Sequence, residues 1–269
     1  MQAFFLDATQ GQRFCLYHPA REGRKQGAII YLHPFAEEMN KSRRMAALQA
    51  RAMAGAGFDV LQIDLQGCGD SSGDFGDATW QTWRQDVHEA CQWLRTRSHA
   101  PLTLWGLRSG CLLATDVAAD LPERANFVFW QPVVSGKQHW QQFMRLKMAG
   151  ELVSGQSKGV VERIRKQLAT GKPAEIAGYT VSPGLAEGLE KAELHPPAIR
   201  PGRVSWIEVA NRENATIAPV AQSCIAQWQA LGFSVEASLV RGPAFWQTTE
   251  IEDAPELIAA TLAALEQGL

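Results

Sequence analysis

The chain has 269 residues, of which 46% are hydrophobic and 20% are charged, and its formal net charge is −2. This length and composition are typical of one globular domain with a sizeable core. The small net charge gives no global reason to expect binding to nucleic acid or to an anionic membrane. No apolar run approaches the roughly 18 residues of a membrane span, and the first residues lack the basic region of a secretory signal. We therefore expect a cytoplasmic protein without a membrane span.

The cysteines are odd in number and widely spaced, and none of them forms a C-x-x-C pair. This pattern argues against a disulfide framework and against a zinc site. We expect buried thiols, a reducing compartment, no metal and no cofactor. The five cysteines are Cys15, Cys68, Cys91, Cys111 and Cys224.

The first half of the chain alternates short apolar runs, which predict strands, with apolar residues at helical spacing. The first two strands are expected to pair as an antiparallel edge. In chain order the predicted elements are strands at 3–6, 13–17 and 28–32, a helix at 45–56, a strand at 58–63, a helix at 80–97, a strand at 101–105, a helix at 111–119 and a strand at 126–130.

The alternation breaks after residue 136. Residues 137–202 contain helical stretches at 140–152 and 160–168 and a proline-rich loop at 195–202, but no strong strand. We interpret residues 137–202 as a helical cap inserted between two strands of the sheet.

Strand and helix patterns resume at residue 203. Alternating strands and helices predict a mostly parallel sheet, here of eight strands, with helices on both faces. The core is then formed by residues 1–136 and 203–269. The last predicted elements are a strand at 203–209, a helix at 220–231, a strand at 234–240 and a helix at 251–265.

A glycine-bracketed turn, Gly106-Leu107-Arg108-Ser109-Gly110, follows the strand at 101–105. Its glycines have the spacing of the nucleophile elbow G-x-S-x-G, a sharp turn from strand to helix that lifts only its central side chain into the active site. Here the central residue is Arg108, and Ser109 stands one place late. Because a guanidinium stays protonated in proteins, Arg108 cannot act as a nucleophile. The five residues favour the α/β-hydrolase fold and argue against its usual chemistry.

The partners of a catalytic triad are also incomplete. In this fold the acid and then the histidine follow the nucleophile along the chain. Glu213, or Asn214 in the alternative register, follows the strand that ends near residue 209. The histidine is expected at 241–246, but the last histidine of the chain is His195. A hydroxyl therefore cannot be activated by a histidine in the usual geometry.

Arg108 needs a partner, because a cation at the start of a helix opposes the helix dipole. Glu37 and Glu38 follow the strand at 28–32, whose end neighbours the elbow in this topology. We predict a structural ion pair between Arg108 and one of these two glutamates. Arg108 can also receive a ligand phosphate or carboxylate through its bidentate fork, and the two roles are compatible.

Backbone N–H donors near the elbow can join Arg108 in forming an anion site. The N–H groups of Phe35 and Ser109 stand where the oxyanion hole of this fold is built, and Ser109 begins a helix whose dipole favours anions. His33 precedes this loop. It is a candidate base or polar clamp, but a histidine that orders the loop through hydrogen bonds is the simpler interpretation. Ser109 is expected to cap the helix, and its use as a nucleophile is the alternative.

Three other positions remain candidates. Cys68 lies between glycines in a loop and is a possible nucleophile, although nothing in the sequence lowers its pKa. Asp64, which follows the strand at 58–63, is typical of a turn organiser. Phe245 and Trp246 occupy the loop of the missing histidine, and we expect them to fill or line the pocket.

Four blocks of sequence resemble one subgroup of the α/β-hydrolase superfamily, the hydrolase type 2 proteins associated with the exosortase A system. The resemblance covers essentially the whole chain, and it implies a role beside exopolysaccharide synthesis and the sorting of PEP-CTERM proteins. It identifies no substrate. The blocks are HPFAEEMNKSR at 33–43, DLQGCGDS at 64–71, GLR at 106–108 and FWQTTE at 245–250.

Three functions stay open at this point. The leading hypothesis is a protein that lacks the Ser–His–Asp triad and binds a small or lipid-like anionic or acyl ligand. The first rival is an active esterase, thioesterase or acyl transferase with a rearranged site, for which the candidates are Arg108, His33, Glu38, Ser109 and Cys68. The second is a pseudoenzyme that binds a protein of the exosortase or exopolysaccharide system.

Overall fold

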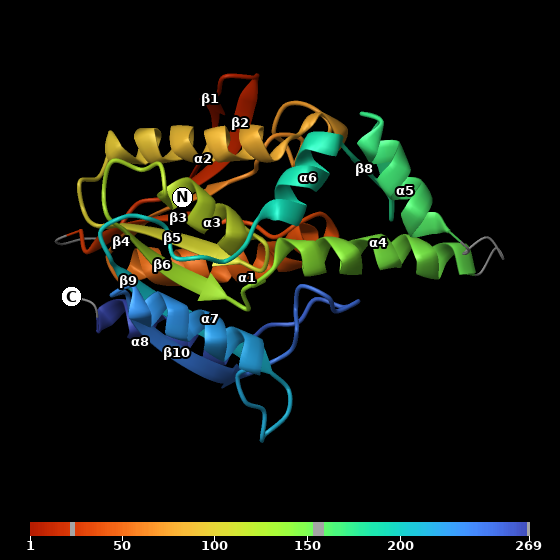
Figure 1. Ribbon diagram of the computed structural model, residues 1–269. Helices are drawn as coiled ribbons and strands as arrows, with labels where there is room; N and C mark the ends of the chain where they lie inside the picture. The colour runs from red at the N-terminus through yellow and green to blue at the C-terminus, as the bar shows by residue number, and fades with distance from the viewer. Residues whose placement is uncertain (22–24, 153–158, 268–269) are drawn as a thin grey trace.

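A single eight-stranded sheet organises the molecule, as the computed structural model of residues 1–21, 25–152 and 159–267 shows (Figure 1). The strand order is β1-β2-β4-β3-β5-β6-β9-β10. This confirms the predicted α/β-hydrolase architecture of eight strands. The strands are β1 (Gln2–Asp7), β2 (Gln12–His18), β3 (Gly27–Leu32), β4 (Phe58–Ile63), β5 (Leu102–Leu107), β6 (Ala125–Trp130), β9 (Arg203–Ala210) and β10 (Ser234–Arg241).

The first two strands form the expected antiparallel edge. β1 pairs antiparallel with β2, β2 pairs antiparallel with β4, and the strands from β4 to β10 run parallel. β3 lies next to β5, with Leu32 opposite Gly106. Because parallel strands end at the same edge of a sheet, the loop after β3 and the elbow after β5 lie side by side.

Helices cover both faces of the sheet and bury two apolar clusters. α1 (Glu37–Gly55) and α8 (Pro255–Glu266) pack on one face. α2 (Trp80–Arg95), α3 (Gly110–Ala118) and α7 (Pro219–Ala230) pack on the other. Among the described residues, no helix is long and apolar enough to cross a membrane.

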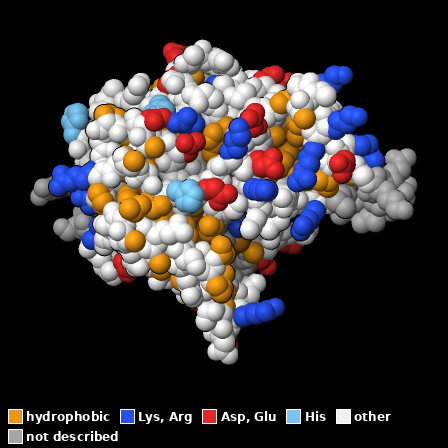
Figure 2. Space-filling view, viewed as in Figure 1, with side chains coloured by type: hydrophobic (Ala, Val, Ile, Leu, Met, Phe, Trp, Pro, Cys, Tyr) orange, Lys and Arg blue, Asp and Glu red, His pale blue; other side chains and the backbone are white. Residues whose placement is uncertain are grey.

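In the described residues between β6 and β9, five elements lie outside the main sheet. Figure 1 shows α4 extending away from the sheet, with α5 and α6 beside it. On the face in view, Figure 2 shows basic and acidic side chains interleaved over this region. The elements are α4 (Gly136–Leu152), α5 (Val160–Ala169), β7 (Ala174–Ile176), β8 (Tyr179–Val181) and α6 (Pro183–Lys191).

The expectation of no strand in this segment is wrong. β7 and β8 pair as an antiparallel hairpin. The turn between them, Ala177-Gly178, has φ values of 50° and 83°, as a two-residue hairpin turn with positive φ requires. Each strand has only three residues, which is too short for an alternating pattern to register in the sequence.

Helix α1 begins earlier than the expected Met45. It starts at Glu37, and its first two turns bury Met39 and Ser42 among exposed charged residues. The polar composition of these turns hides the helical period. The earlier start places Glu37 and Glu38 in the first turn, where acidic side chains complement the helix dipole.

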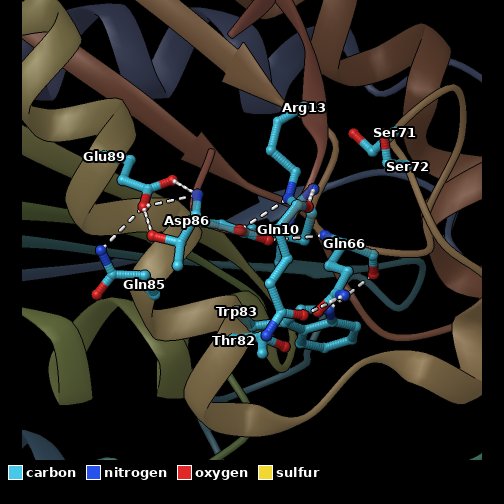
Figure 3. A network of polar contacts seen from close by, with 12 residues as sticks. Gln10, Arg13, Gln66, Ser71, Ser72, Thr82, Trp83, Gln85, Asp86 and Glu89 are labelled. Carbon is cyan, nitrogen blue, oxygen red and sulfur yellow. Dashed lines mark hydrogen bonds and ion pairs between the residues drawn. The ribbon is translucent and has the colours of Figure 1, made fainter. Parts of the chain in front are cut away.

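A buried ion pair joins strand β2 to helix α2 (Figure 3). Arg13 Nε lies 2.7 Å from Asp86 Oδ1, and the two side chains are 1% and 2% exposed. The other oxygen of Asp86 accepts a hydrogen bond from the backbone N–H of Gln66 at 2.7 Å, and Arg13 donates to the carbonyl of Gln10. One carboxylate thus holds together β2, α2 and the loop that follows β4.

Candidate functional site

Arg108 occupies the apex of a strained elbow between β5 and α3. Its φ is 55°, in the left-handed region that non-glycine residues rarely adopt. Hydrogen bonds to the end of β6 hold it there: Arg108 N–H donates to the carbonyl of Trp130 at 3.0 Å, and its own carbonyl accepts from Val133 at 3.3 Å. The backbone geometry of a nucleophile elbow is therefore present, with a guanidinium at its centre.

The two bracketing glycines are required by close backbone contacts. A Cβ atom on Gly106 would lie 2.6 Å from the backbone nitrogen of Cys111. One on Gly110 would lie 2.2 Å from the carbonyl oxygen of Leu32, at the end of β3. The elbow can approach β3 this closely only with glycine at these places, as the motif predicts.

Arg108 pairs with Glu38, as expected from the sequence. Arg108 Nε lies 3.4 Å from Glu38 Oε1, and the side chains are 14% and 17% exposed. The ring of Trp246 lies beside the guanidinium, 5.5 Å from its carbon to the ring centre. Arg108 is thus held between a carboxylate on one element and an aromatic ring on another.

The surroundings of Glu38 disfavour the charged form of its carboxyl group. Burial raises the pKa of its carboxyl, and Arg108 and the side chain of Gln247 oppose this shift only in part. The second oxygen, Oε2, is buried without a hydrogen-bond partner. The carboxylate therefore satisfies Arg108 incompletely, and Arg108 keeps donors for another acceptor.

Arg108 and Glu38 line one wall of a cavity of about 130 Å³. The first turn of α1, the elbow, α4 and the loop after β10 all contribute to it, so it lies where the inserted segment meets the sheet. Its walls combine apolar and polar side chains. The lining residues are Phe35, Glu37, Glu38, Arg108, His139, Gln142, Phe143, Leu146 and Gln247.

His139, on α4, is a cavity residue that sequence reasoning missed. It is 7% exposed, and its Nδ1 atom is buried without a hydrogen-bond partner. Burial, together with the positive charge of Arg108, lowers its pKa to about 3. The ring is therefore neutral at physiological pH. No motif marks this histidine, because its position depends on how α4 packs on the sheet.

The predicted backbone donors remain available. Phe35 lines the cavity, and Ser109 starts α3 beside Arg108. Among the described residues, neither backbone N–H has a protein acceptor. Phe35 and Arg108 are part of the cavity wall, whereas Ser109 is not among the residues that line it.

The Ser109 side chain does not play its expected capping role. Ser109 stands at the N-cap position of α3, but its φ and ψ are helical and its hydroxyl makes no capping hydrogen bond. The side chain is buried and does not line the cavity. The tight turn imposed by Arg108 continues directly into the helix, so the extended N-cap conformation is lost.

His33 orders the loops around the elbow. Its Nδ1 lies 2.8 Å from the carbonyl of Pro34, and its Nε2 accepts the backbone N–H of Leu65 at 3.3 Å. Burial lowers its pKa, which favours the neutral ring. Both nitrogens are occupied, and His33 does not line the cavity. The geometry supports the structural interpretation and gives no support to His33 as a base.

Cys68 is a buried thiol whose pKa burial raises. The positive charges of Arg43 and Arg13 oppose this shift only in part, so the thiol is not activated. In the same loop, Asp64 receives both terminal nitrogens of Arg43, the closer one at 3.0 Å. These contacts fit a turn organiser and an inert cysteine rather than a catalytic pair.

The loop at the place of the missing histidine is filled by aromatic side chains. Phe245 is 1% exposed and packs edge-on against Trp130 and Trp246. Neither Phe245 nor Trp246 is among the residues that line the cavity, and both side chains are buried in the place of the missing histidine. The ring of Trp246 packs against the guanidinium of Arg108. The next residue, Gln247, lines the cavity.

The two residues predicted at the place of the triad acid lie on the surface. Glu213 is 81% exposed and lies 3.9 Å from Arg241 in a surface pair. Asn214 is exposed in the same loop. Neither side chain lines the cavity with Arg108. Among the described residues, no cluster of three or more histidine, cysteine or acidic side chains is arranged to hold a metal ion.

Solved structures with the same fold include several hydrolases. Est1E from Butyrivibrio proteoclasticus, with bound ferulic acid, matches 99% of each chain with a TM-score of 0.70 and 13% identity. A thermostable carboxyl esterase from Bacillus coagulans, in complex with glycerol, matches 99% of this chain and 98% of that chain with a TM-score of 0.65 and 13% identity. At this level of identity the similarity establishes the fold alone.

Sequence comparison defines the family. The human protein ABHD12B is 33% identical over 118 residues, which make up 43% of this chain and 31% of that protein. The match thus spans about a third of the relative's length. The model of the serine aminopeptidase S33 family matches residues 23–191, which is more than half of the chain. The chain therefore belongs to the serine aminopeptidase S33 family within the α/β-hydrolase superfamily.

Proposed function

We propose that this protein binds a small or lipid-like anionic ligand at Arg108 and does not use Ser–His–Asp chemistry. The observation that carries this proposal is the guanidinium at the apex of the elbow, with φ of 55°, on the wall of a cavity. A binding cation has replaced the nucleophile while the strained turn that presents it is kept.

The surroundings of Arg108 suit an anion. A guanidinium can bind a carboxylate or phosphate through two parallel hydrogen bonds. The unpaired N–H groups of Phe35 and Ser109 add donors beside it. The long contact to Glu38, at 3.4 Å, is weak enough for a ligand anion to compete with it. We further propose that residues 137–202 act as the cap of this site.

The cellular setting is part of the same proposal. The resemblance to exosortase A-associated proteins favours a cytoplasmic role in exopolysaccharide or PEP-CTERM-linked metabolism. The carboxylate or phosphate group of a small or lipid-like ligand fits a guanidinium. Binding to a protein of that system is the alternative if the cavity takes no ligand.

Calorimetric titration of the protein with sulfate and with octanoate at pH 7 tests the binding. We expect both anions to bind, and Arg108→Gln to weaken them at least about tenfold, because a charge-assisted hydrogen bond contributes roughly 1.5–3 kcal/mol. Arg145→Gln is the matched control, since Arg145 is exposed on α4 and does not line the cavity. Equal affinity in the two variants would contradict the site and favour the partner-binding function.

A fluorophosphonate probe, which labels activated serines, tests the chemistry. We expect no labelling of the intact protein, because Arg108 stands at the nucleophile position and both nitrogens of His33 are occupied. Stoichiometric labelling of Ser109, located by mass spectrometry, would overturn this part of the proposal. The active esterase or acyl transferase would then be the better function.

A further inference from the structure

We propose that the ligand held by Arg108 is a hydroxy carboxylic acid with an apolar tail, and that His139 selects it by binding its hydroxyl group. This inference rests on the proposed function, because it assumes that an anion binds at Arg108. It adds the chemical class of the ligand and a specificity residue on α4.

His139 has one buried polar atom, Nδ1, without a protein partner. Its side chain is 7% exposed and lines the cavity that Arg108 also lines. Nδ1 is buried without a hydrogen-bond partner, and the ring stands edge-on to Phe35 with the centres 6.4 Å apart. A buried polar group without a partner costs free energy, and a ligand that supplies the partner recovers it.

The charge state of His139 restricts what that partner can be. With a pKa lowered to about 3, the imidazole is neutral and offers one N–H donor and one acceptor nitrogen. A hydroxyl group also donates and accepts, so it matches a neutral imidazole. A second anionic group would find no positive charge on His139 to attract it. An ammonium group would be repelled by Arg108.

Glu38 adds a second acceptor next to the same space. Its Oε2 atom is buried without a partner and belongs to a side chain of the cavity wall. A ligand that placed only an anion here would face Glu38 and Glu37 as like charges. A ligand that also carries a hydroxyl group can donate to a carboxylate or to the imidazole. The lining therefore favours an acid with a neutral donor over a second anion.

The apolar part of the cavity indicates the tail. Phe35 and Phe143 stack edge-on with centres 5.0 Å apart and form one apolar wall. Leu146, on α4, also lines the cavity and is 55% exposed. A cavity of about 130 Å³ suits the head group of a ligand. The chain of the ligand can then leave along Leu146.

Titration with octanoate, 2-hydroxyoctanoate and 3-hydroxyoctanoate at pH 7 tests the inference. We expect at least one hydroxy acid to bind the wild type about three- to tenfold more tightly than octanoate, the range given by one net hydrogen bond. His139→Leu should remove this preference and leave the affinity for octanoate within about twofold. His139→Asn, which keeps an amide in place of the imidazole, should retain part of the preference.

Arg145→Gln is the matched control, because Arg145 is exposed on the same helix and does not line the cavity. It should keep the preference for the hydroxy acid. Melting temperatures of all variants show whether each one is folded. If His139→Leu is not folded, the ligand preference is compared between the wild type and His139→Asn instead.

The outcomes separate this inference from the proposed function. If octanoate does not bind the wild type, the proposed function fails. If octanoate binds through Arg108 but neither hydroxy acid is preferred, only the inference fails. A preference that survives in His139→Leu would assign the hydroxyl to another residue and would overturn the role of His139.

Discussion

Arg108 is kept in a conformation that costs free energy although it performs no nucleophilic attack. A non-glycine residue at φ of 55° costs on the order of 1–3 kcal/mol, so the surrounding contacts must hold it. The hydrogen bond to Trp130 and the close approach of Gly110 to Leu32 do so. The contacts of the elbow therefore offset the strain and fix the position of the guanidinium.

Glu38 makes anion binding depend on pH. A sulfate ion at Arg108 lies beside the Glu38 carboxylate, which repels it while charged, and burial already raises the pKa of that group. We expect the wild type to take up a proton at Glu38 when sulfate binds. The affinity should then fall as the pH rises through the titration of Glu38, by at most about tenfold per pH unit.

Glu38→Gln should abolish this dependence and bind sulfate more tightly than the wild type at about pH 8. Calorimetry in buffers of different ionisation enthalpy measures the proton uptake directly. Glu37→Gln is the control, because Glu37 is exposed and accepts its hydrogen bond from Tyr179. The same pH dependence in the wild type and in Glu38→Gln would contradict the coupling.

The partners of Arg108 differ in how far the sequence predicts them. Glu38 is predictable, because the strand order places the end of β3 beside the elbow whatever the side chains are. His139 is not, because it lies on α4 and its position depends on packing between the inserted segment and the sheet. Trp246 is intermediate: the sequence places it in the right loop, but packing turns it behind Arg108 rather than into the cavity.

At the scale of elements, long periodic segments are well predicted and short polar ones are not. The parallel strands are continuous apolar runs, which the sequence reveals directly. The start of α1 is hidden by charged residues, and the hairpin of β7 and β8 is too short to show a period. The missed elements belong to the surroundings of the cavity, which limits what the sequence reveals about the ligand.

The ion pair between Arg13 and Asp86 connects β2 to α2. We expect the protein to lose stability when only one of the two charges is removed. Asp86→Ala leaves Arg13 buried and unpaired, which costs roughly 3–5 kcal/mol. Urea unfolding measures the change.

The double variant Arg13→Met with Asp86→Leu removes both charges and should lose less stability than Asp86→Ala. Arg44→Ala is the control, because Arg44 forms an exposed pair with Asp253. If Asp86→Ala stays within about 1 kcal/mol of the wild type, the pair is not a structural tie.

The molecule as a whole should lose stability on mild acidification. Burial lowers the pKa of four histidines below 6.5, so the unfolded chain binds their protons before the folded protein does. The free energy of unfolding therefore falls as the pH drops below about 6.5. The four are His18, His33, His88 and His139.

Comparison with His139→Leu isolates one contribution. Between about pH 6.5 and pH 5 the variant should lose up to about 2 kcal/mol less than the wild type, because one histidine contributes at most about 1.4 kcal/mol per pH unit. Burial raises the pKa of Asp86 to about 6, which acts in the opposite direction, but this effect is common to both proteins and cancels. Identical pH profiles from urea unfolding would show that His139 has an ordinary pKa.

The five cysteines of the chain are all free and buried. Burial raises the pKa of each thiol, to about 11 for Cys224 and about 12 for Cys15, and the reactive thiolate is therefore scarce in the folded protein. The five lie on different parts of the molecule: β2, the loop after β4, α2, α3 and α7. Alkylation of each cysteine thus requires that its own element opens. The alkylation rates of the five cysteines therefore report the order in which these elements unfold.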